Sequence, residues 1–202
     1  MINNICNYTP RTDLIIEKLL PLYEEGRCIL VLSDRRNHLL DIENGLKKHD
    51  IECGYYVGGM KKDALKESEG KKIIIATYSM AAEALDIKTL TTLIMATPKT
   101  EVEQSIGRIL RAKHSQPLVI DVVDTHTVFQ RQAAKRVTYY KKQGYQIVKD
   151  GELLPGKKNS NKNKETVFGG KCMLHMDAGL LTHQAPAAQP SAPVRAPPPT
   201  IA

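Results

Sequence analysis

Four residues in the segment QSIGRILR (104–111) have types and spacing suited to phosphate chemistry: Gln104, Gly107, Arg108 and Arg111. On a helix, Gln104, Arg108 and Arg111 lie at positions i, i+4 and i+7 and therefore share one face. Two arginines on a rigid face can bind phosphate oxygens in forked geometry and offset the charge that develops on a transferred phosphoryl group. Gly107 leaves the backbone bare, so another surface can approach closely. The alternative is a solvated basic face on an ordinary helix.

Other polar residues and glycines stand where runs of apolar residues end. They are Ser33, Asp34 and Arg36 after the run 28–32, Gly58 and Gly59 after the run 52–57, Thr77 at the end of the run 72–77, and Asp86 further along. If the runs are strands of one parallel sheet, residues that follow them gather at one edge of the sheet and are candidates for a functional site. Each also has a plainer interpretation, because Thr77 fits a strand, Asp86 can cap a turn and the glycines can serve turn geometry.

The elements that would position these residues alternate between short apolar runs and amphipathic stretches. The expected strands are residues 28–32, 52–57, 72–77, 93–96 and 118–123, and the expected helices are residues 11–25, 38–49, 61–69, 102–112 and 128–143. A wholly apolar run such as CILVL is typical of a strand buried on both faces of a parallel sheet. The alternation predicts a doubly wound α/β fold, with a mainly parallel sheet and helices on both faces. In such sheets functional residues gather at the carboxyl ends of the strands.

The composition changes near residue 151. Residues 1–150 are expected to form one α/β domain, whereas residues 151–202 are polar and basic at first and rich in Pro and Ala toward the end. Such a composition cannot bury a core, so residues 151–202 are predicted to stay disordered. On this interpretation, deleting them leaves the melting temperature nearly unchanged.

Overall composition is that of an ordinary globular protein, with 42% hydrophobic and 25% charged residues. No apolar run approaches the roughly 18 residues that span a bilayer, and the first residues lack a signal-peptide pattern, so no membrane partner is expected. The four cysteines are far apart in sequence and are expected to be free thiols in a reducing intracellular compartment. The net charge of +7 is compatible with a polyanionic partner but does not identify it as nucleic acid.

Three motifs carry a resemblance to a known family. The segment QSIGRILR (104–111) resembles motif VI of superfamily 2 helicases, ATYSMAAEALDIK (76–88) resembles motif V, and LVLSDRR (30–36) resembles motif IV. Their order, spacing and placement agree with the second RecA-like domain of that family. The resemblance covers residues 27–124 and is closest to helicases of the XPB and type III restriction type, including those of large DNA viruses and phages.

The resemblance implies roles at a nucleotide. Arg108 and Arg111 would face the γ-phosphate of ATP across a cleft between two motor domains, and Arg111 would be the arginine finger. Gln104 would lie by the γ-phosphate or the attacking water. Asp86 would contact the ribose or link the nucleotide and nucleic-acid sites, and Gly107 would lie beside the nucleotide.

The resemblance also implies contacts to DNA or RNA, single-stranded or duplex. Thr77 would contact the nucleic-acid backbone through its hydroxyl or amide. The other residues expected to meet the strand are Ser33, Asp34, Arg36, Gly58 and Gly59. The chain departs from motif V at Ala84, where the family commonly has glycine, and at Lys88, where it often has proline, so the local backbone path there is less well defined by the resemblance.

The 202 residues contain no GxxxxGK[ST] motif and no DExx box. A phosphate-binding loop and a Mg²⁺-binding carboxylate are therefore expected on a phosphate-loop RecA-like domain, in cis or in trans, which would hold most of the ATP and Mg²⁺. The expected function is the second motor domain of an ATP-dependent helicase or translocase. The alternatives are a non-catalytic module that binds nucleic acid or a protein partner, and another doubly wound enzyme such as a glycosyltransferase.

Two further charged groups allow more than one interpretation. Asp121 and Asp124 resemble a metal-binding pair, but they are more simply explained as carboxylates that orient the local backbone. The helix 128–143 carries four basic residues, namely Lys135, Arg136, Lys141 and Lys142. These residues either touch phosphates or form a solvated face, and the solvated face is the simpler expectation.

Overall fold

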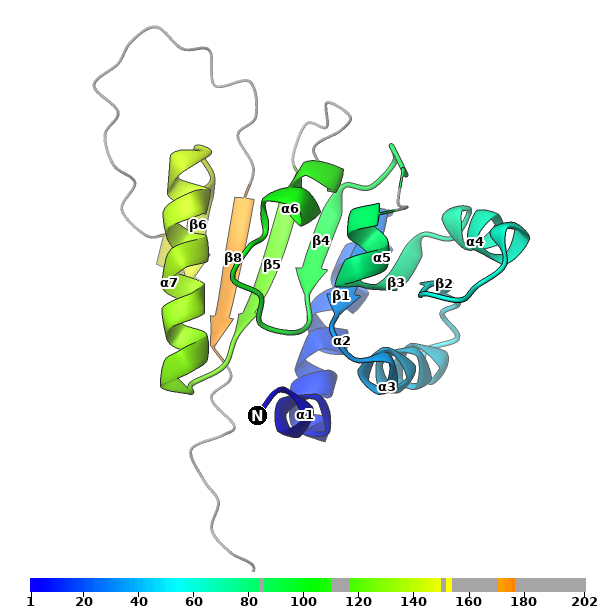
Figure 1. The fold of residues 1–202 in the computed structure, drawn as a ribbon, viewed down its shortest axis with the longest axis horizontal. Helices are drawn as coiled ribbons and strands as arrows, with labels where there is room; N and C mark the ends of the chain where they lie inside the picture. The colour runs from blue at the N-terminus through cyan, green and yellow to red at the C-terminus, as the bar shows by residue number, and fades with distance from the viewer. Residues whose placement is uncertain (84–85, 110–116, 150–151, 154–170, 177–202) are drawn as a thin grey trace, which may run out of the picture.

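An eight-stranded sheet runs through the centre of the part of the chain that this computed structural model describes, which is residues 1–83, 86–109, 117–149, 152–153 and 171–176 (Figure 1). The order of its strands is β2-β3-β1-β4-β5-β8-β6-β7. The strands are β1 (Ile29–Ser33), β2 (Gly54–Tyr56), β3 (Ile73–Thr77), β4 (Thr92–Met95), β5 (Leu118–Val123), β6 (Gln146–Lys149), β7 (Glu152–Leu153) and β8 (Lys171–Met176). Every neighbouring pair is parallel except β6 and β7, so the predicted mainly parallel sheet is confirmed.

Helices connect most of the strands. They are α1 (Ile2–Cys6), α2 (Thr9–Glu24), α3 (Arg36–Lys47), α4 (Lys62–Glu69), α5 (Tyr78–Glu83), α6 (Glu103–Ile109) and α7 (Thr127–Lys142). Because β1–β5 are parallel, each connection between them crosses back over the sheet, and every one of these strands begins at the same edge. Among the described residues, no helix is both long and apolar enough to cross a membrane.

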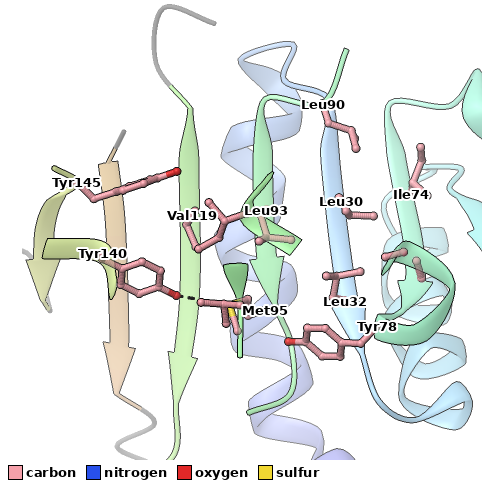
Figure 2. Close-up of a cluster of buried hydrophobic side chains, with 14 of the residues drawn as sticks. Leu30, Leu32, Ile74, Tyr78, Leu90, Leu93, Met95, Val119, Tyr140 and Tyr145 are labelled. Carbon is pink, nitrogen blue, oxygen red and sulfur yellow. Dashed lines mark hydrogen bonds between the residues drawn. The ribbon is translucent and has the colours of Figure 1, made fainter. Parts of the chain in front are cut away.

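The two faces of the sheet bury two separate cores, because successive strand residues point to opposite sides. On one face, Leu30, Leu93 and Val119 pack with residues of α5, α6 and α7, including Tyr78 and Tyr140 (Figure 2). The opposite face packs against α2 and α3. Its residues include Val31, Ile75 and Ile94 from the strands, Ile15 and Leu19 from α2, and Leu39 and Ile42 from α3. Helices therefore cover both faces, as the alternating sequence pattern predicts.

The parallel register brings the carboxyl ends of the central strands together at one edge. Ser33 of β1 lies opposite Thr77 of β3, and Leu32 lies opposite both Ala76 of β3 and Met95 of β4. The segments that follow these strands consequently leave the sheet side by side. This edge is where the candidate residues were expected.

The expected strands 28–32, 52–57, 72–77, 93–96 and 118–123 correspond to β1–β5, with ends that differ by at most two residues. The expected helices correspond to α2, α3, α4, α6 and α7; residues 110–112 of the expected helix 102–112 lie outside the described residues. The sequence pattern did not predict α1, α5 or β6. Each of these elements is four to six residues long, which is too short to show a clear hydrophobic period.

The prediction of disorder from residue 151 onward is wrong for two short segments. β7 pairs with β6, and β8 lies between β5 and β6 as a full member of the sheet. β8 has the sequence KCMLHM, a short run with apolar residues inside a tail whose overall composition is polar and rich in Pro and Ala. The prediction followed the average composition of the tail and overlooked this local run. Residues 154–170 and 177–202 lie outside the described residues.

Candidate functional site

A cavity of about 940 Å³ opens at the carboxyl edge of the sheet. Its walls come from the segments after β1, β2, β3 and β4, together with α5, the start of α6 and one residue of α7. Five of the residues singled out from the sequence line it: Asp34, Arg36, Gly58, Thr77 and Gln104. The fold therefore brings residues from all three motif segments around one cavity.

Three of the candidate residues, Ser33, Asp34 and Arg36, lie at the end of β1 or just after it. Ser33 is fully buried, and its hydroxyl lies 3.1 Å from Nδ1 of His38 and accepts a hydrogen bond from the Arg35 amide at 3.2 Å. The structure thus points the Ser33 side chain into the protein rather than toward the cavity. Asp34 and Arg36 line the cavity, and Arg36 donates a hydrogen bond to the carbonyl of Gly58.

Gly58 and Gly59 follow β2 and differ in what they require. A Cβ at Gly58 would lie 3.3 Å from Nη2 of Arg36 and 3.9 Å from Sδ of Met80, so a larger residue would crowd the arginine. Gly59 has φ of +86°, and a Cβ at this position would meet no atom within 4 Å. Glycine is therefore favoured here by the backbone conformation and not by lack of space. The turn interpretation fits Gly59, whereas Gly58 contributes directly to the wall of the cavity.

Thr77 ends β3 at the cavity, with its hydroxyl 3.3 Å from that of Ser79. Both hydroxyls are within reach of a ligand, because Thr77 is half-buried and Ser79 is exposed. Asp86 is exposed and does not line this cavity. The structure therefore brings Thr77, but not Asp86, together with the other candidates.

α6 presents an open face at the cavity. Val102 and Ile106 are buried beneath this helix, while Gln104 is exposed and lines the cavity. A Cβ built on Gly107 would meet nothing within 4 Å, so this part of the helix surface is free of neighbours from the described residues. Arg108 lies in the last turn of α6, and Arg111 lies outside the described residues.

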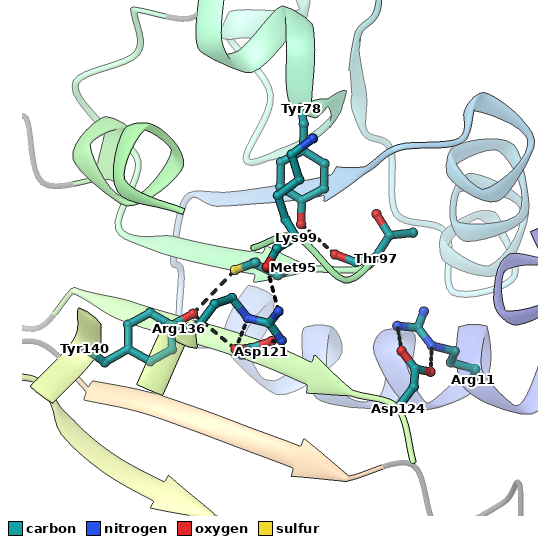
Figure 3. A network of polar contacts seen from close by, with 9 residues as sticks. All are labelled: Arg11, Tyr78, Met95, Thr97, Lys99, Asp121, Asp124, Arg136 and Tyr140. Carbon is teal, nitrogen blue, oxygen red and sulfur yellow. Dashed lines mark hydrogen bonds and ion pairs between the residues drawn. The ribbon is translucent and has the colours of Figure 1, made fainter. Parts of the chain in front are cut away.

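Two buried arginines hold the loop between β4 and α6 by its carbonyl groups, and Figure 3 shows the bond from Arg136 to Lys99. Arg11 of α2 donates from Nη1 to the carbonyl of Ala96, and Arg136 of α7 donates from Nη1 to the carbonyl of Lys99 at 2.6 Å. Both arginines are at most 1% exposed. Elements from opposite faces of the sheet thus fix the path of the segment that leads into α6.

Two more hydrogen bonds fix the middle of the same loop. The Tyr78 hydroxyl donates to the carbonyl of Thr97 at 2.8 Å, and the Asp34 amide donates to the Thr97 hydroxyl at 2.9 Å. Burial raises the pKa of Tyr78 well above its usual value, so this hydroxyl remains a donor at all physiological pH. The segments after β1, β3 and β4 are therefore tied to one another beside the cavity.

Asp121 and Asp124 each bind one of the buried arginines. Asp121 accepts two hydrogen bonds from Arg136, at 2.7 and 2.8 Å, and Asp124 accepts two from Arg11, at 2.6 and 3.1 Å. Within the described residues, no cluster of three or more metal-ligating side chains is found. The expectation that these carboxylates orient the local backbone is corrected, because they orient arginine side chains that in turn bind backbone carbonyls.

Arg136 also corrects the expectation of a uniformly solvated basic face on the last helix, since it is 1% exposed. Burial disfavours its charge, but the carboxylate and hydrogen bonds of Asp121 outweigh that effect and raise the pKa of the guanidinium. The burial of Arg136 could have been predicted from the spacing of the apolar residues of α7. Phe129, Ala133, Arg136 and Tyr140 lie at i, i+4, i+7 and i+11, which places the arginine on the apolar stripe of α7.

Lys99 is a cavity residue that the motif-based prediction missed. Its ammonium lies 3.6 Å from Oδ1 of Asp34 and 5.3 Å from the centre of the Tyr78 ring. Six charged residues from the described part of the chain line the cavity: Asp34, Glu83, Glu101, Glu103, Arg36 and Lys99. With four carboxylates and two cations among them, the two cations are the groups that can attract phosphate.

Comparison with known proteins shows which family has this arrangement. The helicase conserved C-terminal domain matches residues 12–113, which is half of the chain. This chain belongs to the helicase conserved C-terminal domain family. The match spans the three motif segments and the strands β1–β4 that hold them around the cavity.

Individual relatives of this helicase domain come from large DNA viruses. A protein of Acanthamoeba polyphaga mimivirus, named as an ATP-dependent RNA helicase, is 39% identical over 155 residues, covering 74% of this chain and 30% of the relative. A protein of African swine fever virus with a similar name is 34% identical over 102 residues, covering 48% of this chain and 20% of the relative. The chain thus spans less than a third of the length of these relatives.

The solved structure of UvsW from T4 has the same fold as this helicase domain. Its TM-score is 0.56 at 20% sequence identity, and the match covers 70% of this chain and 34% of UvsW. The predicted RecA-like fold is therefore confirmed, as is the resemblance to the C-terminal domains of superfamily 2 helicases. At family level the chain contains a helicase conserved C-terminal domain.

Part of the surface of α6 is accessible to a ligand or to another protein surface. Gln104 is exposed at the cavity, and the bare backbone at Gly107 has no neighbour among the described residues. These groups can contact one side of a bound nucleotide. The sequence contains no GxxxxGK[ST] motif, the loop whose backbone amides and lysine bind the phosphates of a nucleotide in phosphate-loop proteins.

Proposed function

We propose that this chain is the second motor domain of an ATP-dependent helicase or translocase. In this role it contacts the strand and supplies arginines to an ATP site completed by a phosphate-loop domain in cis or in trans. The observation that carries the proposal is the convergence of Asp34 and Arg36, Thr77, and Gln104 on one cavity from three separate sequence segments. Secondary-structure elements from both faces of the sheet fix the loops that carry them.

In this proposal, the ends of β1, β2 and β3 contact the nucleic-acid strand, and α6 contacts the nucleotide. Arg36, Gly58 and Thr77 lie at the ends of β1, β2 and β3, where a guanidinium, bare backbone and a hydroxyl can contact the backbone of a strand. Gln104 and Gly107 lie on α6, whose exposed face would meet the other domain. By their spacing in the sequence, Arg108 and Arg111 would share a helical face with Gln104 and would stabilise charge on the transferred phosphoryl group.

ATP with Mg²⁺ would supply the phosphoryl group whose hydrolysis drives opening and closing of the cleft between the domains. Within this chain, Gln104 would orient the attacking water or contact the γ-phosphate, and the arginines would enter as the cleft closes. The loop between β4 and α6 is rigidly held, so closing motions would carry α6 as one piece with the sheet. Because the viral relatives are named as RNA helicases, RNA is the first strand to test.

The proposal is tested by ATP hydrolysis measured for the chain alone and after addition of a phosphate-loop domain, with and without single-stranded RNA or DNA. The expected result is negligible turnover by the chain alone and strand-stimulated turnover by the pair. Strong strand-stimulated turnover by the chain alone would show that it holds a complete site. Strand binding without any turnover in the presence of the phosphate-loop domain would favour the non-catalytic binding module.

A further inference from the structure

Lys99 lines the cavity, and its main chain is held by a hydrogen bond from Arg136 (Figure 3). Its carbonyl accepts the hydrogen bond from the buried Arg136 at 2.6 Å, so the main chain at this position is fixed. Its side chain is 42% exposed, with the ammonium over the ring of Tyr78 and 3.6 Å from the carboxylate of Asp34. A fixed backbone and an accessible ammonium are suited to contacting a ligand in the cavity.

The contact between Lys99 and Asp34 is loose. A charge-assisted hydrogen bond between an ammonium and a carboxylate is usually about 2.7–2.9 Å long, well below the 3.6 Å seen here. Both side chains are partly exposed, and pairs of this kind contribute little free energy. The ammonium of Lys99 can therefore leave Asp34 and bind a phosphate in the cavity with only a small loss of free energy.

Asp34 itself is poorly suited to the strand contact expected from its sequence position. An ionised carboxylate only accepts hydrogen bonds and repels phosphate. Lys99 lies beside it, on the loop that follows the neighbouring strand β4, and carries the charge that phosphate requires. Arg36, the other cation of the cavity, donates to the carbonyl of Gly58 and can share a phosphate group with Lys99.

Building on the proposed function, we infer that Lys99 binds a backbone phosphate of the single strand and that Asp34 holds its ammonium when no strand is present. Phosphate chemistry is shared by the strand backbone and by ATP. The strand is favoured because Lys99 pairs with Asp34 at the end of β1, beside Arg36 and the carboxyl ends of β2 and β3.

The test is a titration of fluorescently labelled single strands, oligouridine RNA first and oligothymidine DNA second, with the full 202-residue chain at several salt concentrations. Lys99→Ala should weaken binding about two- to fivefold at low salt, as expected for one exposed ion pair. It should also make the slope of log affinity against log salt shallower by about 0.7, the value for one phosphate contact to a single strand. Lys99→Arg should restore both quantities, because it keeps the charge.

Two further variants separate this contact from a general effect of charge. Lys48→Ala removes an exposed lysine just after the end of α3, at the opposite edge of the sheet from the cavity, and should leave the slope unchanged. Asp34→Asn should tighten binding by freeing Lys99, and this gain should shrink when it is combined with Lys99→Ala. A binding assay with labelled ATP, carried out after addition of the phosphate-loop domain, should show no difference between the parent chain and Lys99→Ala.

Each outcome decides the inference. A salt slope for Lys99→Ala equal to that of the parent chain would overturn it, as would a loss of ATP binding with strand binding intact. If the parent chain binds no strand even at the lowest salt, both the inference and the strand contacts of the proposed function fail. If the parent chain binds the strand and Lys99→Ala binds it with the same affinity and salt slope, the proposed function stands and the inference alone fails. Melting temperatures equal to that of the parent confirm that each variant is folded.

Discussion

At the scale of single residues, the buried pair of Arg136 and Asp121 shows how polar groups build this site. Arg136 gives two hydrogen bonds to the carboxylate and one to the carbonyl of Lys99, and the Tyr140 hydroxyl donates to the same carboxylate at 3.2 Å. A buried ion pair adds little net stability compared with apolar residues of similar volume, but it is costly to break. The main effect of the pair is therefore to fix the conformation of the loop between β4 and α6, through the bond from Arg136 to the Lys99 carbonyl.

Arg136→Ala is expected to lower the free energy of unfolding by about 3–5 kcal/mol, because it leaves the Asp121 carboxylate buried without a counter-charge. Chemical denaturation measures this loss. Adding Asp121→Asn should recover part of it, since the uncompensated charge is then removed. The neighbouring exposed Lys135→Ala should change stability by less than about 0.5 kcal/mol. A cost below about 1 kcal/mol for Arg136→Ala would mean that the pair is not buried as described.

His38 predicts a dependence of stability on pH. Burial, and after it the charge of Arg11, lower the pKa of His38 to about 4, whereas the unfolded chain has the usual value near 6.5. Between these values the unfolded state binds more protons, so the folded protein should lose stability as the pH falls from 6.5 to 4. The expected loss is about 3 kcal/mol, and it should be complete near pH 4.

Denaturation at a series of pH values measures this effect, with His38→Gln as the matched variant that does not titrate. Its stability at neutral pH will be lower, because the bond with Ser33 changes, but its slope between pH 6.5 and 4 should be flatter than that of the parent chain. Identical slopes for the two proteins would exclude His38 as the source of the acid sensitivity.

At the scale of elements, β8 joins two parts of the sheet. It pairs in parallel with β5 along six residues and with β6 along four. Without β8, both strands would expose unpaired backbone groups to solvent, and β6 would lose its connection to the rest of the sheet. The carboxyl-terminal part of the chain thus contributes to the domain, although it lies beyond the predicted boundary at residue 150.

Deletion of residues 150–202 is therefore expected to lower the melting temperature. For a chain of this size 1 kcal/mol corresponds to roughly 2–4 °C, and the loss of a central strand should exceed that clearly. Thermal denaturation followed by circular dichroism gives the answer. Deletion of residues 177–202, which removes none of the described elements, is the control and should leave the melting temperature unchanged. An equal melting temperature for both deletions would restore the original expectation of a dispensable tail.

Local sequence patterns predicted the elements whose signal is local. β1–β5 are continuous apolar runs, and α2, α3 and α7 are long enough to show a helical period. β8 could not be predicted in the same way, because its position in the sheet depends on pairing with strands about 25 to 50 residues earlier in the chain. Motif positions similarly located Thr77 and Gln104, whereas Lys99 was missed because its contacts depend on how three loops pack together.

At the scale of the whole molecule, the domain presents an open site at one edge of its sheet. Its two cores fix α2 and α3 on one face and α5, α6 and α7 on the other, and these helices hold the loops at the carboxyl edge. The cavity there combines residues suited to a strand with a helix whose exposed face lacks a neighbour among the described residues. In the proposed motor, a second domain would cover that face.

In the proposed motor, α6 and the residues after it complete an ATP site on another domain. The most direct test is Arg111→Ala in the motor assembled from this chain and a phosphate-loop domain. Because Arg111 would act mainly on charge that develops during transfer, kcat should fall by about 10³-fold or more while strand affinity stays within about twofold. Thr77→Ala, as the reciprocal control, should weaken strand binding or its coupling more than basal hydrolysis. A kcat for Arg111→Ala within about twofold of the parent motor would show that Arg111 is not an arginine finger.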